Sequence, residues 1–526
     1  MKKIENLDFG FADAQNYKMR ENKYLFDRVF IKNDYLESLC KPNISFLIGE
    51  KGTGKTAYAV YMSNSAYKNN KSEVKYIRET EYRKFITLKE EKHLQLSDYT
   101  NIWKVIIYLL LCQKINEEEG DSFSFANFGK FKAVKETINE YYYSAFSPEI
   151  IQALEFVQNS KLAAELLAKH AKLKGEQSET FTFTESRFQA NLFYIQKKFE
   201  DAIKQIRLDS NYLLFIDGID IRPSGIPYEE YLECIKGLAN AVWEVNTDFF
   251  PSIKGGKGRC RVVLLIRPDI FESVGLQNQN AKIRDNSVFL DWKTDYISHR
   301  TSKIFEVSDH LLGVQQNGDE KTFGENWNHY FPWNSPNVFD TYDCPTSFIN
   351  FLRWSYYRPR DIVTLLTLIK DHTKDQSKDS FTLDDFEARD FQRAYSNYLL
   401  GEIKDQLSFY YQGNDYETFL KFFEFLKGKD KFTYEQYGIA YEEMMAYLKS
   451  VSRRPPKFMH SKNEFLQFLY DLNVLCYLER PKEGKALIHW CFKERNYSNI
   501  SPKVKTDLEY QVFYGLAKAL NLGKQY

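Results

Sequence analysis

The chain has 526 residues, enough for about two to four domains at roughly 100–200 residues each. Its 72 basic and 72 acidic residues cancel, which excludes a protein that coats nucleic acid through overall positive charge, so any such contact has to be local. The 37 Tyr and 42 Phe exclude a largely disordered chain. Seven scattered Cys without a CxxC pair indicate reduced thiols, as in a cytoplasmic protein.

Neither a leader peptide nor a membrane span is expected. The first residues, MKKIENLDFGFADAQ, lack the apolar stretch of a signal peptide. The longest apolar run, Val105–Cys112, is far shorter than the ~20 residues that cross a bilayer. We therefore expect a cytoplasmic protein that makes no membrane contact.

The first half of the chain alternates between apolar runs and helical patterns. A helix is predicted at Tyr24–Cys40, followed by a buried strand, a glycine-rich turn and another helix. A helical insertion is predicted over about 100–205, ending in an amphipathic helix at Arg187–Ile206. Three buried strands separated by helices indicate an α/β fold with a parallel sheet covered on both faces. The expected strands are Ile44–Ile48, Tyr212–Ile216 and Arg261–Phe271, and the expected helices after the first two are Ala57–Ala66 and Tyr228–Asn246.

The second half has a helical pattern from Thr346 onward, with one helix beginning at Pro359, a favoured first-turn residue. Two helices, Phe432–Ser450 and Ser461–Leu475, precede a hairpin within Val474–Phe492, which is the layout of a winged helix. The predicted domains are an α/β core at 1–310, a helical domain at 311–408 and a winged-helix domain at 409–526.

The turn after the first strand carries the chemistry that a phosphate needs. It fits G-x-x-x-x-G-K-[ST] at every position, and it lies between a strand and a helix, as that motif requires. Glycines let the backbone aim its N–H groups at phosphates, and the next helix presents its positive end to them. Lys55 is expected to reach the β and γ phosphates, and Thr56 is expected to hold Mg²⁺. The nucleotide-binding residues are Gly49, Glu50, Lys51, Gly52, Thr53, Gly54, Lys55 and Thr56.

Two carboxylates follow the second strand. Asp217 ends the run LLFID, and the carboxyl end of a parallel strand is where such sheets bind ligands, so it is the expected second Mg²⁺ ligand. Many ATPases place Glu directly after this Asp, but here the next residue is Gly218. Asp220 is the nearest acid, and it either positions the attacking water or caps the following turn.

Three arginines are candidates for sensing the terminal phosphate. Arg267 follows the third strand, and the alternative for it is a local salt bridge with Asp269. Arg358 and Arg360 flank Pro359 at a helix start, from which an arginine of a lid domain could reach back to a nucleotide. Arg360 is the favoured one, with a merely exposed arginine as the alternative, and Arg222 and Arg300 are weaker candidates.

These motifs together resemble the STAND and origin-recognition branch of AAA-type P-loop ATPases, and in particular a bacterial group found beside phage-defence genes. The likeness covers most of the chain outside 100–205. It implies an ATPase core, a lid that carries a sensor arginine, and a C-terminal winged helix. The missing Glu after Asp217 departs from the pattern and favours a slow switch over a motor. The matching stretches are FGFADAQ, GEKGTGKTA, FIDGID, LLIRPDIF, YYRPRDIV and NEFLQFLYDLNVLCYL with IHW.

The leading hypothesis is a homo-oligomeric regulatory ATPase that uses ATP and Mg²⁺ and acts with an effector protein in anti-phage defence or a related sensing task. The second is a DNA-binding ATPase of origin-recognition type, either a loader or a transcription regulator. It relies on a basic stretch before the second helix of the winged helix, where positive side chains would contact phosphates. A nucleotide-dependent scaffold without turnover is the third. The basic residues are Lys449, Arg453, Arg454, Lys457 and Lys462, with Lys482 and Lys485 on the wing.

Overall fold

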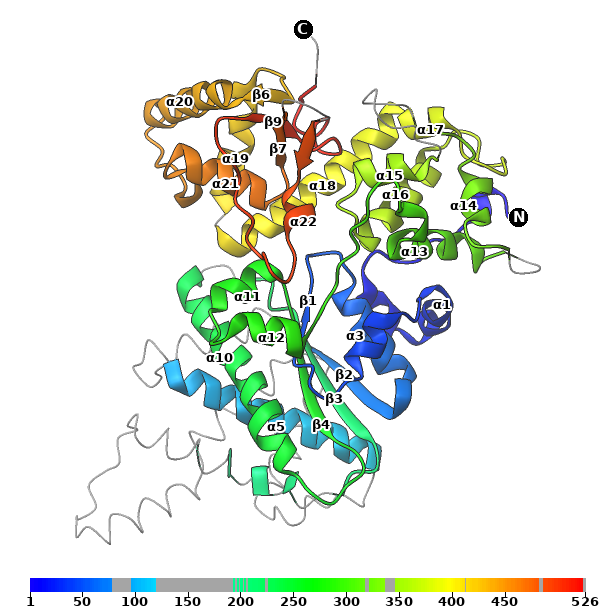
Figure 1. Cartoon of the computed structure of the whole chain (residues 1–526), viewed down its shortest axis with the longest axis vertical. Coiled ribbons are helices and arrows are strands. Elements are labelled where there is room, and N and C mark those ends of the chain that lie inside the picture. Colours follow the sequence, from blue (N-terminus) through cyan, green and yellow to red (C-terminus); the bar gives the residue numbers. More distant parts are fainter. Residues whose placement is uncertain are drawn as a thin grey trace. The chain divides into compact units, whose positions relative to one another are not determined.

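A computed structural model of the chain describes two compact units (Figure 1). Unit 1 comprises Met1–Ile31, Glu50–Gly54 and Leu290–Tyr526, and unit 2 comprises Lys32–Gly49 and Lys55–Phe289. The described residues are 1–77, 96–119, 207–222, 226–316, 321–335, 346–411, 413–481 and 486–523, together with scattered positions between 193 and 204. The predicted boundaries at 310 and 408 stay predictions.

Unit 2 is built on a parallel sheet with the strand order β2-β3-β4-β1-β5. Its central strands are buried along nearly their whole length, which explains their continuous apolar sequences. The α/β prediction with a parallel sheet is confirmed. The strands are β1 (Phe46–Ile48), β2 (Asn70–Tyr76), β3 (Asn211–Asp217), β4 (Cys260–Ile266) and β5 (Ser287–Phe289).

Helices cover this sheet, and Figure 1 shows α3 on one side of the strands and α10 on the other. The apolar run at Val105–Cys112 lies in α5, where it packs against α10. Their contact is close, because a Cβ added at Gly237 would lie 2.5 Å from the Cβ of Tyr99. The helices of unit 2 are α2 (Asp34–Leu39), α3 (Lys55–Ser65), α5 (Leu96–Glu119), α10 (Tyr228–Glu244), α11 (Pro268–Val274) and α12 (Gln279–Asn286).

The strand order creates a switch point between β1 and β4. These two strands are neighbours, yet the chain leaves β1 towards β2 at one edge of the sheet and leaves β4 towards β5 at the other. Ligands of open parallel sheets bind at the carboxyl ends of strands where the connections diverge in this way. Gly49 and Arg267 stand directly after these two strand ends.

Unit 1 contains a helical part whose core is aromatic. Trp327 stacks on Phe331 with ring centroids 4.4 Å apart, and both rings contact Phe351. The N-terminal segment joins this part, because the Ile4 N–H donates to the Lys378 carbonyl at 3.0 Å. The helices are α1 (Lys23–Val29), α13 (Lys303–Gly313), α14 (Glu325–Tyr330), α15 (Phe348–Trp354), α16 (Pro359–His372), α17 (Leu383–Glu387) and α18 (Arg389–Tyr410).

The C-terminal part of unit 1 combines helices with an antiparallel sheet of order β6-β9-β7-β8. The predicted hairpin is present as β7 paired with β8, and its turn at 482–485, with Lys482 and Lys485, lies outside the described residues. The elements are α19 (Gly413–Phe422), β6 (Lys431–Thr433), α20 (Tyr434–Ser450), α21 (Lys462–Asp471), β7 (Leu475–Glu479), β8 (Leu487–His489), α22 (Cys491–Glu494) and β9 (Glu509–Val512).

Several predicted boundaries were wrong, each for a local reason. The helix expected at Tyr24–Cys40 is two helices, because the Asn33 side chain caps a new start at α2. The strand expected at Arg261–Phe271 ends at Ile266, since Pro268 begins α11. The helices expected at 432–450 and 461–475 each give up residues to strands, the first to β6 and the second to β7.

Most of the predicted insertion at 100–205 lies outside the described residues. Its first part, up to Glu119, belongs to α5, and the described positions between 193 and 204 are helical, as predicted for Arg187–Ile206. In the part of the chain that the structure describes, no helix combines the length and apolar character that a membrane crossing requires.

Candidate functional site

The loop Glu50–Gly54 has a backbone that only glycine adopts easily at two positions. Gly52 has φ +85° and Gly54 has φ +96°. A Cβ on Gly52 would also come within 3.3 Å of the Cβ of Arg360. Gly52 and Gly54 are therefore required for the turn, and Gly52 also for the close approach of α16, which belongs to the same unit.

The carbonyls of three successive loop residues are held by donors from elsewhere in unit 1. Nη1 of Arg358 donates to the Lys51 carbonyl at 2.8 Å, and the backbone N–H of Arg360 donates to the Gly52 carbonyl at 3.3 Å. Nε1 of Trp292 donates to the Thr53 carbonyl at 2.9 Å. We call the loop and these three residues the loop clamp. Sequence reasoning missed Trp292, which belongs to no motif.

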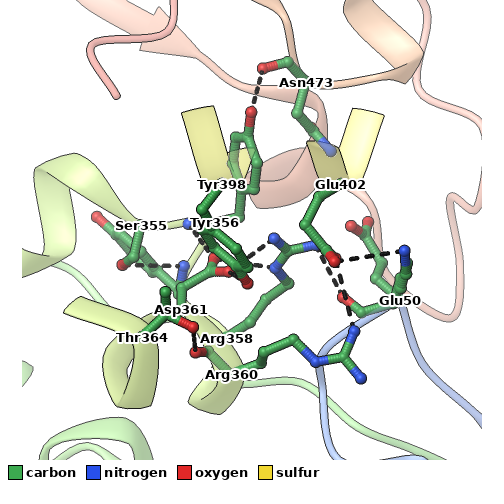
Figure 2. A network of polar contacts seen from close by, with 12 residues as sticks. Glu50, Ser355, Tyr356, Arg358, Arg360, Asp361, Thr364, Tyr398, Glu402 and Asn473 are labelled. Atoms are coloured by element: carbon green, nitrogen blue, oxygen red, sulfur yellow. Dashed lines mark hydrogen bonds and ion pairs between the residues drawn. The ribbon is translucent and has the colours of Figure 1, made fainter. Parts of the chain in front are cut away.

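Arg358 is a fully engaged member of the clamp. Its Nε and Nη2 donate to the two carboxylate oxygens of Asp361 at 2.9 and 2.7 Å, and its guanidinium lies 4.9 Å from the ring centre of Tyr356 (Figure 2). Asp361 is completely buried and also accepts from the Tyr398 hydroxyl at 3.0 Å. Burial by itself would lower the pKa of Arg358, but Asp361, Tyr398 and Glu402 together raise it above its ordinary value. Each of the three guanidinium nitrogens of Arg358 thus donates a hydrogen bond, which suits a structural role.

Arg360 is held more loosely. Its side chain is 25% exposed, its Nε donates to the Ala12 carbonyl at 3.2 Å, and its Nη1 lies 3.6 Å from Oε2 of Glu402 (Figure 2). The last distance is that of an ion pair but is too long for a hydrogen bond. Arg360 can therefore change partners at lower cost than Arg358 can. This difference in partners distinguishes the two arginines that flank Pro359.

The side chains of Glu50 and Lys51 are tied to other parts of unit 1. Oε1 of Glu50 lies 2.7 Å from Nη1 of Arg495, a residue that is 445 positions away and only 7% exposed. Nζ of Lys51 lies 2.7 Å from Asp405 and 3.3 Å from Glu402, both on α18. Glu50 and Lys51, the first two variable positions of the motif, thus anchor the loop instead of facing solvent.

In unit 2, Lys55, Thr56 and Asp217 come together at the carboxyl ends of the strands. Nζ of Lys55 donates to the Gly49 carbonyl at 2.8 Å, which leaves the ammonium folded back over the end of β1. Oγ1 of Thr56 donates to Oδ2 of Asp217 at 2.6 Å. The second carboxylate oxygen of Asp217 accepts from the Gly218 N–H at 2.8 Å. We call Lys55, Thr56, Asp217 and Asp220 the carboxylate site.

The electrostatics of this site favour a bound cation. Burial raises the pKa of Asp217 above its ordinary value, and the nearby charge of Asp220 adds to this, while Thr56 and Lys55 offset part of the rise. Two acids and a hydroxyl are oxygen ligands of the kind that Mg²⁺ prefers. Among the described residues, no group of three or more His, Cys, Asp and Glu could hold a metal. Mg²⁺ commonly takes one or two carboxylates and completes its shell with substrate phosphates and water, so Thr56 and Asp217 are residues that could hold it.

The other arginines of interest have local partners. Nε of Arg267 donates to Oδ1 of Asp269 at 3.1 Å, which is the alternative that the sequence left open for it. Arg222 donates to the Ile226 carbonyl, and Arg300 donates to Oδ1 of Asn328 at 2.6 Å. In this conformation none of the three carries an idle guanidinium, so a sensing role for Arg267 would need the Asp269 pair to open.

Comparisons with known protein families, with curated proteins and with solved structures gave no match for this chain. The candidate residues form two groups: a glycine loop with restrained carbonyls in unit 1, and a lysine, a hydroxyl and two carboxylates at the strand ends of unit 2.

Proposed function

We propose that the chain binds ATP with Mg²⁺ and hydrolyses it slowly, as a regulatory switch. The observation that carries this proposal is the 2.6 Å hydrogen bond from Oγ1 of Thr56 to Asp217. The residue that follows the lysine of a G-x-x-x-x-G-K-[ST] loop and the carboxylate that ends a buried strand are the two protein ligands that such a loop offers to Mg²⁺. They lie within one hydrogen bond of each other although 161 positions separate them.

Each residue has a distinct task in this proposal. Lys55 leaves the Gly49 carbonyl and pairs with the β and γ phosphates, Thr56 and Asp217 hold the metal, and Asp220 orients the attacking water. The bound Mg²⁺ supplies positive charge that offsets the two carboxylates and the phosphates. Arg360, the more weakly held arginine, is the candidate sensor of the terminal phosphate.

Slow turnover follows from the residue after Asp217. Gly218 has φ +87°, and a Cβ there would lie 2.8 Å from the carbonyl oxygen of Ile77. A glutamate, which many ATPases use at this position to activate water, therefore does not fit beside the end of β2. Asp220, three residues after Asp217, is a more distant substitute for that glutamate. This arrangement supports a switch that keeps its nucleotide bound rather than a motor that hydrolyses it rapidly.

The resemblance to STAND and origin-recognition ATPases supports the wider setting of the proposal. In that setting the chain forms homo-oligomers and controls an effector protein in anti-phage defence, and its C-terminal sheet with α20 and α21 is a winged helix. The oligomer, the effector and the winged-helix identity remain predictions.

Release of phosphate from ATP by the full chain tests the proposed activity. We expect slow, Mg²⁺-dependent release that is abolished by Asp217→Ala and strongly reduced by Asp220→Ala. If neither substitution changes the rate, the carboxylate site is wrongly assigned. If the chain binds ATP but releases no phosphate, the scaffold without turnover replaces the switch.

A second candidate function, nucleic-acid contact, is favoured by one feature of the C-terminal part. Arg453 and Arg454 are exposed, and among the described residues neither side chain has a hydrogen-bond or ion-pair partner. Helix α21 is less available to nucleic acid where it carries Gln467, because the side chain of Gln467 donates to the Pro502 carbonyl at 3.1 Å. A salt-dependent shift with duplex DNA that is lost in Arg453→Glu with Arg454→Glu would support this function, and no shift at low salt would exclude it.

A further inference from the structure

The loop clamp fixes the direction of three consecutive peptide groups. In a trans peptide the C=O and the following N–H point in opposite directions. The carbonyls of Lys51, Gly52 and Thr53 all face donors of unit 1. The N–H groups of Gly52, Thr53 and Gly54 therefore each point away from the donor that holds the carbonyl of the same peptide group.

Two of these N–H groups are available to a ligand. The Thr53 N–H closes a turn by donating to the Glu50 carbonyl at 3.3 Å, and its hydroxyl donates to the same oxygen at 2.8 Å. Among the described residues, no group accepts a hydrogen bond from the N–H of Gly52 or Gly54. Successive N–H groups that converge in a turn with left-handed residues form a concave anion-binding nest.

We infer that Trp292 and Arg358 are positioning residues of the phosphate loop: they hold its carbonyls outward and thereby pre-orient the Gly52 and Gly54 N–H groups for an anion. This inference rests on the proposed function. Neither side chain touches the phosphate; each acts by holding a carbonyl that would otherwise be free to turn inward and repel it. Ordering the loop before the ligand arrives removes part of the entropy cost of binding.

Trp292→Phe tests the inference with little change in shape. It removes one hydrogen-bond donor from a side chain that is 6% exposed. Trp327→Phe is the matched control, because Trp327 is also buried in unit 1 and its Nε1 donates to the Ser347 hydroxyl at 3.0 Å, away from the loop. We expect Trp292→Phe to weaken binding of ATP and of inorganic tripolyphosphate by roughly 3- to 10-fold, which corresponds to the net free energy of one hydrogen bond. Trp327→Phe should leave both affinities unchanged.

Thermal melting of both variants separates positioning from folding. Equal losses of melting temperature with unequal losses of tripolyphosphate affinity support the inference. Equal affinities for the two variants overturn it and leave the proposed function standing. Failure of the wild-type chain to bind either ATP or tripolyphosphate overturns both.

Hydrogen exchange of the wild-type chain gives a test that needs no variant. The Gly52 and Gly54 N–H groups should exchange quickly without ligand and become protected when tripolyphosphate is added. Protection of both groups before the ligand is added would show that they already have acceptors, and it would contradict the inference.

Discussion

The loop clamp of unit 1 and the carboxylate site of unit 2 share one sequence motif but are stabilised in opposite ways. In the clamp, Asp361 and Arg358 satisfy each other's charge, so this pair contributes to folding. In the carboxylate site, burial disfavours the charge of Asp217, and the nearby charge of Asp220 adds to that cost. The clamp pair therefore stabilises the fold, whereas the carboxylate site carries a cost that the proposed Mg²⁺ would offset. Substitutions in the two regions should therefore change stability in opposite directions.

Asp361→Asn should have the largest effect, a loss of about 3–5 kcal/mol in the free energy of unfolding, because it leaves the buried Arg358 without its counter-charge. Urea unfolding measures the loss. Asp405→Asn is the control from the same unit. Asp405 is 67% exposed in its pair with Lys51, so its loss should stay below about 1 kcal/mol. Similar losses for the two variants would show that the Arg358 pair is not the centre of the clamp.

Glu50→Gln should have an intermediate effect. The variant keeps the shape of the side chain but removes the charge that faces Arg495, which is only 7% exposed. Glu50 is itself 20% exposed, so we expect a loss of about 1–2 kcal/mol in the unfolding free energy, less than a fully buried charged hydrogen bond would give. A loss no larger than that of Asp405→Asn would show that this anchor does not support the loop.

Asp217→Asn should have the smallest effect, with the opposite sign. The pKa of the Asp217 carboxyl lies above its ordinary value of 3.8, so the folded chain favours the protonated form and the ionised form costs stability at neutral pH. Asparagine carries no such cost. The ligand-free variant should melt higher than the wild type, by about 2–4 °C for each kcal/mol gained.

The pH dependence of the stability gained in Asp217→Asn shows whether the charge of Asp217 causes that gain. The wild type loses stability as pH rises from 3.8 through the raised pKa of Asp217, and above that pKa the cost is complete. The advantage of the variant should therefore be full at neutral pH and shrink as the pH is lowered through the raised pKa. A variant that melts lower than the wild type at neutral pH would contradict the electrostatic account of the site.

The elements that sequence predicted are those whose pattern is local. Strands β1, β3 and β4 lie in continuous apolar runs, whereas β2, NKSEVKY, is mostly polar and β5, SVF, has only two apolar residues, so both were missed. Burial by neighbouring elements defines these two strands, and that burial is not written in their own residues. Chain order alone likewise could not show which strands would be neighbours.

The residues of the candidate site also divide into those that a local sequence pattern predicts and those that only the fold brings together. The glycine loop and Asp217 were recognisable because the motif and the strand end are local signals. Trp292, Glu402 and Arg495 were not, because each meets the loop only through the folding of distant segments. Sequence favoured Arg360 over Arg358 as the sensor, but it could not show how firmly each arginine is held. Their difference comes from Asp361, which neutralises one arginine completely and leaves the other to a longer pair with Glu402.

The central claim is that Gly49–Thr56 binds the phosphates of ATP together with Mg²⁺. Calorimetric titration of the full chain with ATP, with and without Mg²⁺, tests it most directly when Lys55→Ala and Thr56→Val are measured alongside. We expect Lys55→Ala to weaken binding by about 10- to 100-fold, the size of a charged hydrogen bond, and Thr56→Val to lose the benefit of Mg²⁺. Wild-type affinity in Lys55→Ala, or no ATP binding by the wild type, would contradict the claim.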